Sequence, residues 1–429
     1  MTKDCPRFLL NASQILKLTF RMLAQINFSI GKCSCETAFI VQSILTGLGK
    51  NSGISKKDAT LLSLFYLYGF LHFYGEKPVH FSELTHGDIY HSFLYGYYYL
   101  KEMSPLGENA KALLFYDAKY NKLLAKKVVQ LEYASLLFSS SSIYKLIHDT
   151  KGQYSDDDFF KYGFSKFNPL YFRVFRAVDS KRIISQKILN GSYLLDMDSF
   201  FDSLDFTKEE TEQLFKMMVY IMDFKSTQTL QHVIHTASYA ASIGIIKNLS
   251  DDQINELFTA GILHDTGKIS IPNLILESTE KLSAFEFAVI KMHVEETENI
   301  LKNIVPENVF NMALHHHEKL NGTGYPNKLF AKDLTKEDQI LTIADIFSAL
   351  IDKRSYKGKF SLESILKIYT KMADDGEIDK NVPTFIRENF NKLESDKDLF
   401  AIKFAVPLGL VEIQYQEEIL NEFGEQKNA

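Results

Sequence analysis

Histidine and aspartate side chains recur in the second half of the chain at points where the apolar pattern predicts a core. In AGILHDTGKISIP, residues 260–272, an imidazole, a carboxylate and an ammonium group follow the end of an apolar run. A buried charge is costly unless it is paired or bound to a metal ion. Other segments add residues of the same kind, so that the candidate metal ligands are His232, His264, Asp265, His293, His316, His317 and Asp345.

Asp345 is the most informative of these residues because it interrupts ILTIADIFSAL, a segment that is apolar on nearly every side. A lone acid in such a helix is protonated, exposed by local packing, or bound to a cation, and the histidines favour the cation. Six or seven such groups are too many for one ion and suit two. One carboxylate must then bridge the ions, and Asp265 is the candidate because it adjoins His264. Mixed imidazole and carboxylate ligation favours iron or manganese, with zinc as the alternative, over calcium and magnesium.

Each candidate ligand also has a purely structural explanation. A single histidine on an inner helix face is more often a satisfied core residue than a ligand, and only the complete set argues against that explanation. Two further histidines, His235 and His315, occur beside the set, and we expect both to be bystanders.

Helices must position these residues, because helix signals dominate the chain. Capping boxes of the form S/T-x-x-E/Q predict helix starts at Thr207, Ser250 and Ser283. Alternating strand patterns are scarce, and only 9 prolines punctuate the chain. We therefore predict an all-α fold in which four separate helices supply the candidate ligands.

The two halves of the chain carry a degenerate repeat. YGFLHFYG, residues 68–75, matches AGILHDTG, residues 260–267, and three further segments match in the same order at similar spacing. This pattern predicts two tandem copies of one helical domain. The predicted parts are an N-terminal helix at 1–30, a degenerate first copy at 31–150, a connector at 151–205, a second copy at 206–400 and a C-terminal tail at 401–429.

The first copy lacks most of the candidate ligands. His72 and His91 remain, but Phe73 occupies the bridging position, Tyr133 the last ligand position, and Cys35 falls near the first. Without a bridging carboxylate, two ions cannot be held in the same way. We expect this copy to be catalytically inactive and to act as a regulatory or dimerising platform.

Composition and charge exclude several classes of function. A net charge of −6 gives no electrostatic footprint for duplex nucleic acid, and no Lys/Arg run suggests a membrane anchor. No apolar segment is long enough to span a bilayer. The 3 cysteines do not form a disulfide framework, which predicts a cytoplasmic protein.

The motifs of the second copy together resemble the HD-GYP branch of the HD superfamily of metal-dependent phosphohydrolases. The resemblance covers about 206 to 395 and rests on HDTGKISIP, His293, HHEKLNGTGYP and ILTIADIFSALIDKRSYK. It implies a phosphodiesterase that opens the bacterial second messenger cyclic di-GMP to linear pGpG, with onward cleavage to GMP left open. The nucleophile would be a hydroxide activated by two metal ions.

The resemblance also implies individual roles. Asp265 and Lys268 would act in catalysis, and Lys268, Tyr325, Arg354 and Lys357 would contact the substrate. The sequence alone does not show which of His232 and His235 is a metal ligand; the choice of His232 rests on the resemblance to the family. One metal would be held by His232, His264, Asp265 and Asp345, and the other by Asp265, His293, His316 and His317.

Three positions depart from the family pattern. Gln228 stands where some members carry a glutamate that binds a third metal, so we expect two metals. Asn321 replaces the usual aspartate before the GYP run, and Ser348 replaces a frequent aspartate after the last ligand.

Two alternative functions remain open. One is hydrolysis of another cyclic dinucleotide, 3′,3′-cyclic GMP-AMP. The other is a catalytically weak sensor or docking protein, which Asn321 keeps open. The partners we expect are the cyclic dinucleotide, GGDEF or other signalling proteins, and a second copy of the chain in a homodimer.

Overall fold

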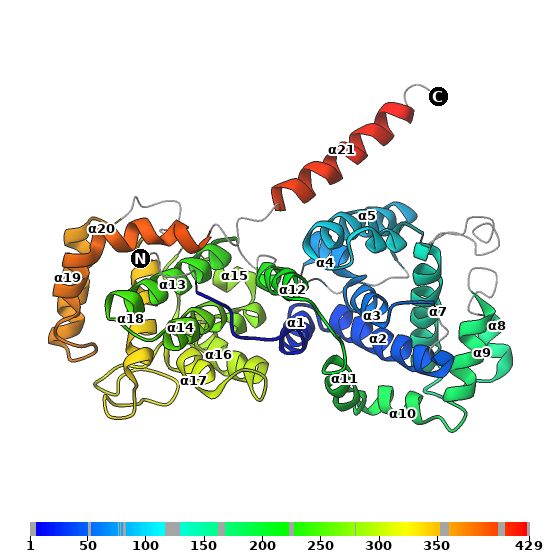
Figure 1. Cartoon of the computed structure of the whole chain (residues 1–429), viewed down its shortest axis with the longest axis horizontal. Helices are drawn as coiled ribbons and strands as arrows, with labels where there is room; N and C mark the ends of the chain where they lie inside the picture. Colours follow the sequence, from blue (N-terminus) through cyan, green and yellow to red (C-terminus); the bar gives the residue numbers. More distant parts are fainter. Residues whose placement is uncertain are drawn as a thin grey trace. The chain divides into compact units, whose positions relative to one another are not determined.

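The chain folds into helices in two compact units (Figure 1). A computed structural model describes residues 6–49, 53–75, 77, 79, 83–115, 129–161, 168–222, 227–278, 280–351, 360–401 and 408–426. Within these ranges there is no β-strand, only an isolated bridge between Asn321 and Phe330. The all-α prediction is therefore confirmed. No helix among the described residues is long and apolar enough to cross a membrane.

The C-terminal unit comprises Met1–Gln14 and Met218–Val406. Its α13 packs against α14, α18 and α20, and the short η4 packs against α16. The helices of this unit are α13 (Thr227–Ile246), α14 (Asp251–Leu263), η4 (Thr266–Ser270), α15 (Asn273–Leu276), α16 (Ala284–Leu301), α17 (Glu307–His315), α18 (Lys336–Ile351), α19 (Leu362–Asp374) and α20 (Val382–Ala401).

The three predicted helix starts are confirmed. The Ser250 hydroxyl accepts from the Gln253 backbone N–H while the Gln253 side chain accepts from the Ser250 N–H, which opens α14 with a complete capping box. Ser283 and Glu286 open α16 in the same way. Thr207 and its partner three residues later make the same reciprocal pair before α12 (Lys208–Ile221).

Two helices of the C-terminal unit approach each other closely at Gly261. A Cβ atom on this glycine would lie 2.6 Å from Cα of Ala237 in α13, so only glycine allows α14 to pack at this separation. His264 follows Gly261 by three residues, and His232 precedes Ala237 by five. The close approach therefore brings these two rings to a centroid separation of 5.7 Å.

The N-terminal unit comprises Ile15–Met217 and Pro407–Ala429. The predicted connector contributes α9–α11, which pack on α2 and α7, and the predicted tail contributes α21, which packs on α5. Its helices besides α12 are α1 (Ala12–Ile26), α2 (Phe28–Leu48), α3 (Lys56–Phe65), α4 (Tyr68–Tyr74), α5 (His86–Met103), η2 (Gly107–Phe115), α7 (Val129–Asp149), α8 (Asp156–Lys161), α9 (Pro169–Val178), α10 (Ile183–Asn190), α11 (Tyr193–Phe201) and α21 (Leu408–Gln426).

The two units share a helix order and helix pairings, but the predicted register of the repeat is wrong. α3 ends at Phe65 and the turn Tyr66–Leu67 leads into α4, just as the turn His264–Asp265 leads from α14 into η4. A Cβ on Gly69 would collide with the backbone of α5, as a Cβ on Gly267 would with that of α16. Tyr66 and Leu67, and not His72 and Phe73, therefore stand where the second copy has its His-Asp pair.

Two other correspondences change with the register. Cys33, not Cys35, stands at the His232 position, because its Sγ lies 3.2 Å from the Tyr66 hydroxyl. Tyr133 lies at the other end of α3, where its hydroxyl accepts from the Ser55 backbone N–H. His72 stacks on Tyr95 at 3.7 Å between ring centroids. Aromatic residues recur so often in this half of the chain that several registers of the repeat place apolar residues equally well.

Candidate metal centre

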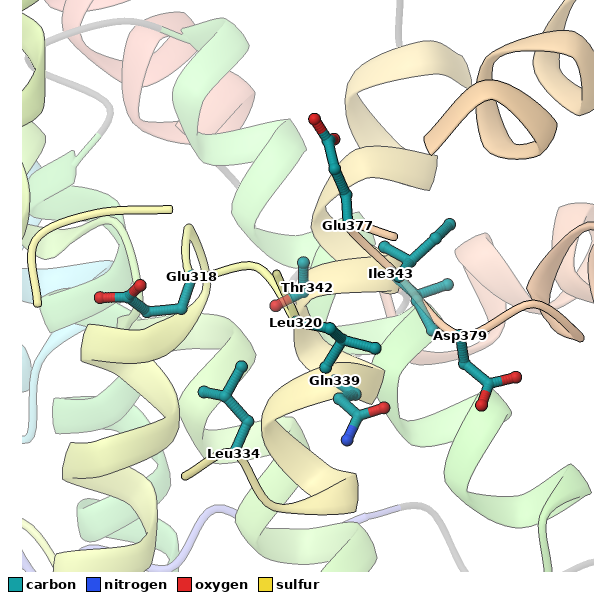
Figure 2. Close-up of a pocket in the computed structure, with 9 residues that line it drawn as sticks. Glu318, Leu320, Leu334, Gln339, Thr342, Ile343, Glu377 and Asp379 are labelled. Atoms are coloured by element: carbon teal, nitrogen blue, oxygen red, sulfur yellow. The ribbon is translucent and has the colours of Figure 1, made fainter. Parts of the chain in front are cut away.

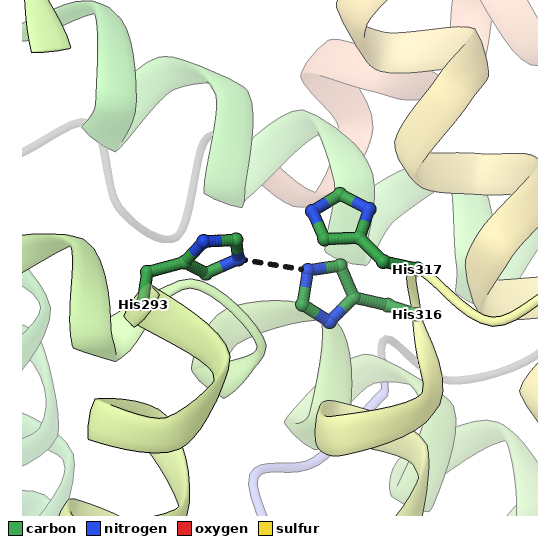
Figure 3. Close-up of side chains that lie close together, drawn as sticks. All are labelled: His293, His316 and His317. Atoms are coloured by element: carbon green, nitrogen blue, oxygen red, sulfur yellow. Dashed lines mark hydrogen bonds between the residues drawn. The ribbon is translucent and has the colours of Figure 1, made fainter. Parts of the chain in front are cut away.

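All seven candidate ligands lie together in the C-terminal unit. They are supplied by five helices or helix ends, where the sequence predicted four. His232 and Asp345 lie within α13 and α18, His293 lies within α16, and the two vicinal pairs follow the C-terminal ends of α14 and α17. Two groups among the described residues have ligand atoms within 4.8 Å of one another: His232 with His264 and Asp265, and His293 with His316 and His317. Figure 3 shows the second group, with its three rings converging.

The carboxylate of Asp265 stands between these two groups and is fully buried. Its Oδ2 lies 3.1 Å from Nε2 of His264 and 3.7 Å from Nε2 of His232. Its Oδ1 faces the other way, 3.5 Å from Nε2 of His293 and 3.8 Å from Nε2 of His316. Each oxygen therefore belongs to a different histidine group, which is the arrangement a bridging carboxylate requires.

Asp345 adds a second carboxylate to the first group. Its Oδ1 lies 2.9 Å from Nε2 of His232 and 3.6 Å from Nε2 of His264. Its Oδ2 lies 3.9 Å from Nδ1 of His317. The acid that interrupts an apolar helix thus points into the cluster of imidazoles.

Backbone carbonyl groups fix the orientation of three imidazoles. The Nδ1–H groups of His264, His293 and His316 donate to the carbonyl oxygens three residues earlier, at 2.8, 2.6 and 2.7 Å. Each ring therefore donates through Nδ1 and turns its Nε2 atom toward Asp265. Such a hydrogen bond on the outer nitrogen is the usual way in which a protein orients a metal-binding histidine.

The donor set fits divalent cations because it leaves lone pairs facing one another. Nε2 of His293 lies 3.3 Å from Nε2 of His316, although neither neutral ring has a proton there to share. Nε2 of His264 and Oδ1 of Asp265 are buried and form no hydrogen bond within the described part of the chain. Buried polar atoms without partners are costly, and an ion of imidazole and carboxylate preference would satisfy all of them.

Charges and burial shift the pKa values of the cluster in opposite directions. Burial lowers the pKa of His293 to about 4 and that of His317 to about 3, so both rings are neutral ligands near pH 7. Burial also acts to lower the pKa of His264, but the Asp265 and Asp345 carboxylates outweigh it and raise this pKa to about 10. In the absence of metal, His264 therefore carries a proton that a cation must displace.

Gly267 and Thr297 hold η4 against α16 beneath the cluster. The Gly267 N–H donates to the Thr297 hydroxyl at 2.9 Å, and that hydroxyl donates to the His264 carbonyl at 3.2 Å. These contacts fix the His-Asp turn relative to His293. Thr297, one turn beyond that histidine, was missed in the sequence because a threonine in a helix carries no signal of its own.

Lys268 and Tyr325 border the cluster. The Lys268 ammonium contacts Oδ2 of Asp265 and offsets part of its charge. The Tyr325 ring packs on the His317 ring at 4.7 Å, and its backbone N–H donates to the His317 carbonyl at 3.2 Å. Burial raises the pKa of the Tyr325 hydroxyl, which keeps it protonated.

The loop that carries Tyr325 is held by Glu318, whose role could not be recognised from the sequence. Its buried carboxylate accepts from the backbone N–H groups of Asn327 at 2.6 Å and Leu329 at 2.9 Å. The position directly after the twin histidines was the only signal that could have drawn attention to it. Glu318 also lines a small pocket with Leu320 and Thr342, shown in Figure 2, but none of the candidate metal ligands lines this pocket.

The departures at Asn321 and Ser348 are accommodated by hydrogen bonds. Asn321 Oδ1 accepts from the Thr323 hydroxyl at 2.7 Å, as an aspartate could, while its Nδ2 donates to the Asp375 carbonyl at 2.9 Å, as an aspartate could not. The Ser348 hydroxyl donates to the His232 carbonyl at 3.2 Å and ties α18 to α13.

Several residues singled out in the sequence are either not described by the structure or do not belong to the metal centre. Arg354, Lys357 and the side chain of Gln228 are not among those the structure describes. His315 lies 3.3 Å from Asp338, and neither it nor His235 belongs to either group of candidate ligands.

Comparison with known proteins matches the segment of the chain that carries this site. The HD domain family matches residues 212–382. The chain is 32% identical over 179 residues to a 3′3′-cGAMP-specific phosphodiesterase 2 of Vibrio cholerae, an alignment that covers 40% of this chain and 34% of the relative. It is 27% identical over 169 residues to the cyclic di-GMP phosphodiesterase response regulator RpfG of Xanthomonas campestris, covering 38% and 44%. The chain thus spans less than half the length of these relatives.

A solved structure extends the likeness of fold beyond the matched domain. The crystal structure of a cyclic GMP-AMP specific phosphodiesterase of V. cholerae aligns with 88% of this chain and 97% of its own length. The TM-score is 0.54 at 18% identity, which bears on the fold alone. From this match and these relatives, residues 212–382 form an HD-family domain of the HD-GYP type.

Proposed function

We propose that this chain is a phosphodiesterase that hydrolyses a cyclic dinucleotide at the candidate metal centre. The observation that carries the proposal is the orientation of Asp265, whose two oxygens face two separate histidine groups. A pure docking protein would not require seven converging donor atoms. The names of the relatives support a cyclic dinucleotide as the substrate class.

The residues divide into two sets around the shared carboxylate. In this proposal one ion would be held by His232, His264 and Asp345, and the other by His293, His316 and His317, with Asp265 serving both. Two divalent ions in such a site supply a nucleophile at neutral pH and stabilise charge on the phosphate. Lys268, at the edge of the metal centre, would place a positive charge near the phosphate. The roles of Arg354 and Lys357 in binding the ligand are carried over from the family motif.

Cyclic di-GMP, opened to pGpG, is the substrate that the sequence motifs favour. A specific observation favours 3′3′-cGAMP as the second candidate. Three relatives named as 3′3′-cGAMP-specific are 30–36% identical to this chain over 149–182 residues. Four relatives named as cyclic di-GMP phosphodiesterases are 27–28% identical, and one named as a probable cyclic di-GMP phosphodiesterase is 35% identical over a shorter stretch of 128 residues. Iron or manganese is the metal we propose, with zinc as the alternative.

The N-terminal unit is proposed to be a degenerate HD copy. Cys33, Tyr66 and Leu67 occupy the positions of three ligands, and none of them is an imidazole or a carboxylate. We assign it a regulatory or dimerising role, with GGDEF or other signalling proteins as partners. We place the activity in the cytoplasm because Cys33 and Cys35 are free thiols.

The test is turnover of both cyclic dinucleotides by protein purified without oxygen. Wild type should form linear product from at least one of them, and Asp265→Asn should form none, because the substitution removes a charged donor from both ions. His235→Gln is the matched control, one turn from His232 on the same helix but outside the centre, and it should retain turnover. Equal turnover by wild type and Asp265→Asn would end the proposal.

A further inference from the structure

Lys291 lies on α16, two residues before the candidate ligand His293, and its ammonium group makes cation–π contacts with two aromatic rings. Its Nζ lies 4.7 Å from the centroid of Phe287, one turn earlier on the same helix, and 4.8 Å from that of Tyr325. Both contacts lie within the range of cation–π interactions. The two rings thus hold the ammonium group in place between α16 and the loop that follows the twin histidines.

The charge of Lys291 is not neutralised by a carboxylate within the described part of the chain. This separates it from Lys268, whose ammonium contacts Asp265, and from Lys302 at the end of α16, whose Nζ lies 3.1 Å from Oε1 of Glu298. An ammonium group placed on aromatic rings keeps its capacity to donate to an anion. Lys291 is therefore an available cation near the cluster.

The connection to the metal centre runs through one ring. Tyr325 contacts the Lys291 ammonium and packs on the ring of His317, a candidate ligand, with 4.7 Å between the two ring centroids. An anion at Lys291 would therefore lie one ring away from the ligand shell. It would be a neighbour of the phosphate being cleaved, and not that phosphate itself.

We propose that Lys291 binds the second, uncleaved phosphate of a dinucleotide substrate, with Phe287 as the surface against which the substrate packs. The inference rests on the proposed function, since a cyclic dinucleotide carries two phosphodiesters and the ion pair can hold only one. Phe287 is 47% exposed although it is aromatic. Exposed aromatic rings beside a cation suit a ligand that joins bases to phosphates.

The test compares substrates with one and with two phosphates. The probes are a cyclic dinucleotide and bis(p-nitrophenyl) phosphate, a small phosphodiester that can occupy only the metal centre. Lys291→Met, which keeps an unbranched side chain without the charge, should raise KM for the dinucleotide about tenfold with a much smaller change in kcat. The preference for the dinucleotide, taken as the ratio of the two kcat/KM values, should fall accordingly.

Two further variants define the outcome. Lys291→Arg should restore most of the preference because it keeps the positive charge, and Lys302→Met should leave the ratio as in wild type. An unchanged ratio in Lys291→Met, with wild-type metal content, would overturn the inference while leaving the proposed function standing. Failure of the wild type to cleave either substrate would instead refute the proposed function.

Discussion

Substitution of Gly267 by alanine should break the contact that aligns the two halves of the metal centre. A Cβ at this position would lie 2.5 Å from the backbone nitrogen of Thr297 and 2.8 Å from its hydroxyl oxygen. Both are closer than packed atoms can approach, and the backbone of α16 cannot rotate away as a side chain could. η4 and α16 would therefore have to separate, which would move Asp265 relative to His293.

The magnitude follows from two effects. Overpacking of this kind costs about 1–3 kcal/mol, and loss of the Gly267–Thr297 hydrogen bond adds about 1 kcal/mol. A helical alanine regains less than about 1 kcal/mol over glycine. The free energy of unfolding should thus fall by about 2–3 kcal/mol.

The assay is denaturant unfolding of the metal-free protein, with metal content measured separately on reconstituted protein. Gly244→Ala is the matched control, because a Cβ there would meet only side-chain atoms, at 3.1 Å from Leu257 and 3.3 Å from Ile254. It should change stability by less than about 1 kcal/mol. If Gly267→Ala unfolds like wild type and still binds two ions, the reasoning on the close contact is wrong.

Three further predictions concern the loop and the protons of the centre. Asn321→Asp should destabilise the loop by about 1–3 kcal/mol, because a carboxylate oxygen would face the Asp375 carbonyl; an unchanged melting temperature would contradict this. Glu318→Gln should weaken the hydrogen bonds from the backbone N–H groups of Asn327 and Leu329 and so lower turnover. Wild-type turnover in this variant would show that the loop keeps its conformation without the carboxylate. Metal binding at pH 7 should release about one imidazole proton, from His264, because its pKa is raised to about 10, and affinity should rise with pH toward that value. Calorimetry in buffers of different ionisation enthalpy measures that release, and uptake of a proton would refute it.

The candidate site was largely predictable from the sequence because its chemistry is carried by residue type. An acid inside an apolar helix and histidines at helix ends are costly in a core, so they stand out without knowledge of the fold. Asp265 adjoins His264, which also identified it as the bridging candidate. The helix starts were predictable for a similar reason, since a capping box is a local hydrogen-bonded pair such as Ser250 with Gln253.

The features that could not be predicted depend on contacts between distant segments. Thr297 matters only because Gly267 packs against it, and Glu318 only because two backbone N–H groups of a later loop reach its carboxylate. The register of the degenerate copy was misassigned because an apolar match cannot distinguish Tyr66 from His72. The close packing of a glycine does distinguish them, because Gly69 lies against the backbone of α5 as Gly267 lies against that of α16.

The number of ions that depend on Asp265 tests the account most directly. Metal analysis of wild type, His317→Asn and Asp265→Ala, each reconstituted without oxygen, should give about two ions, about one ion and less than one ion per chain. The shared carboxylate predicts this order, because its loss removes an oxygen donor from both sites at once. Retention of one or two ions by Asp265→Ala would show that the two sites do not share it.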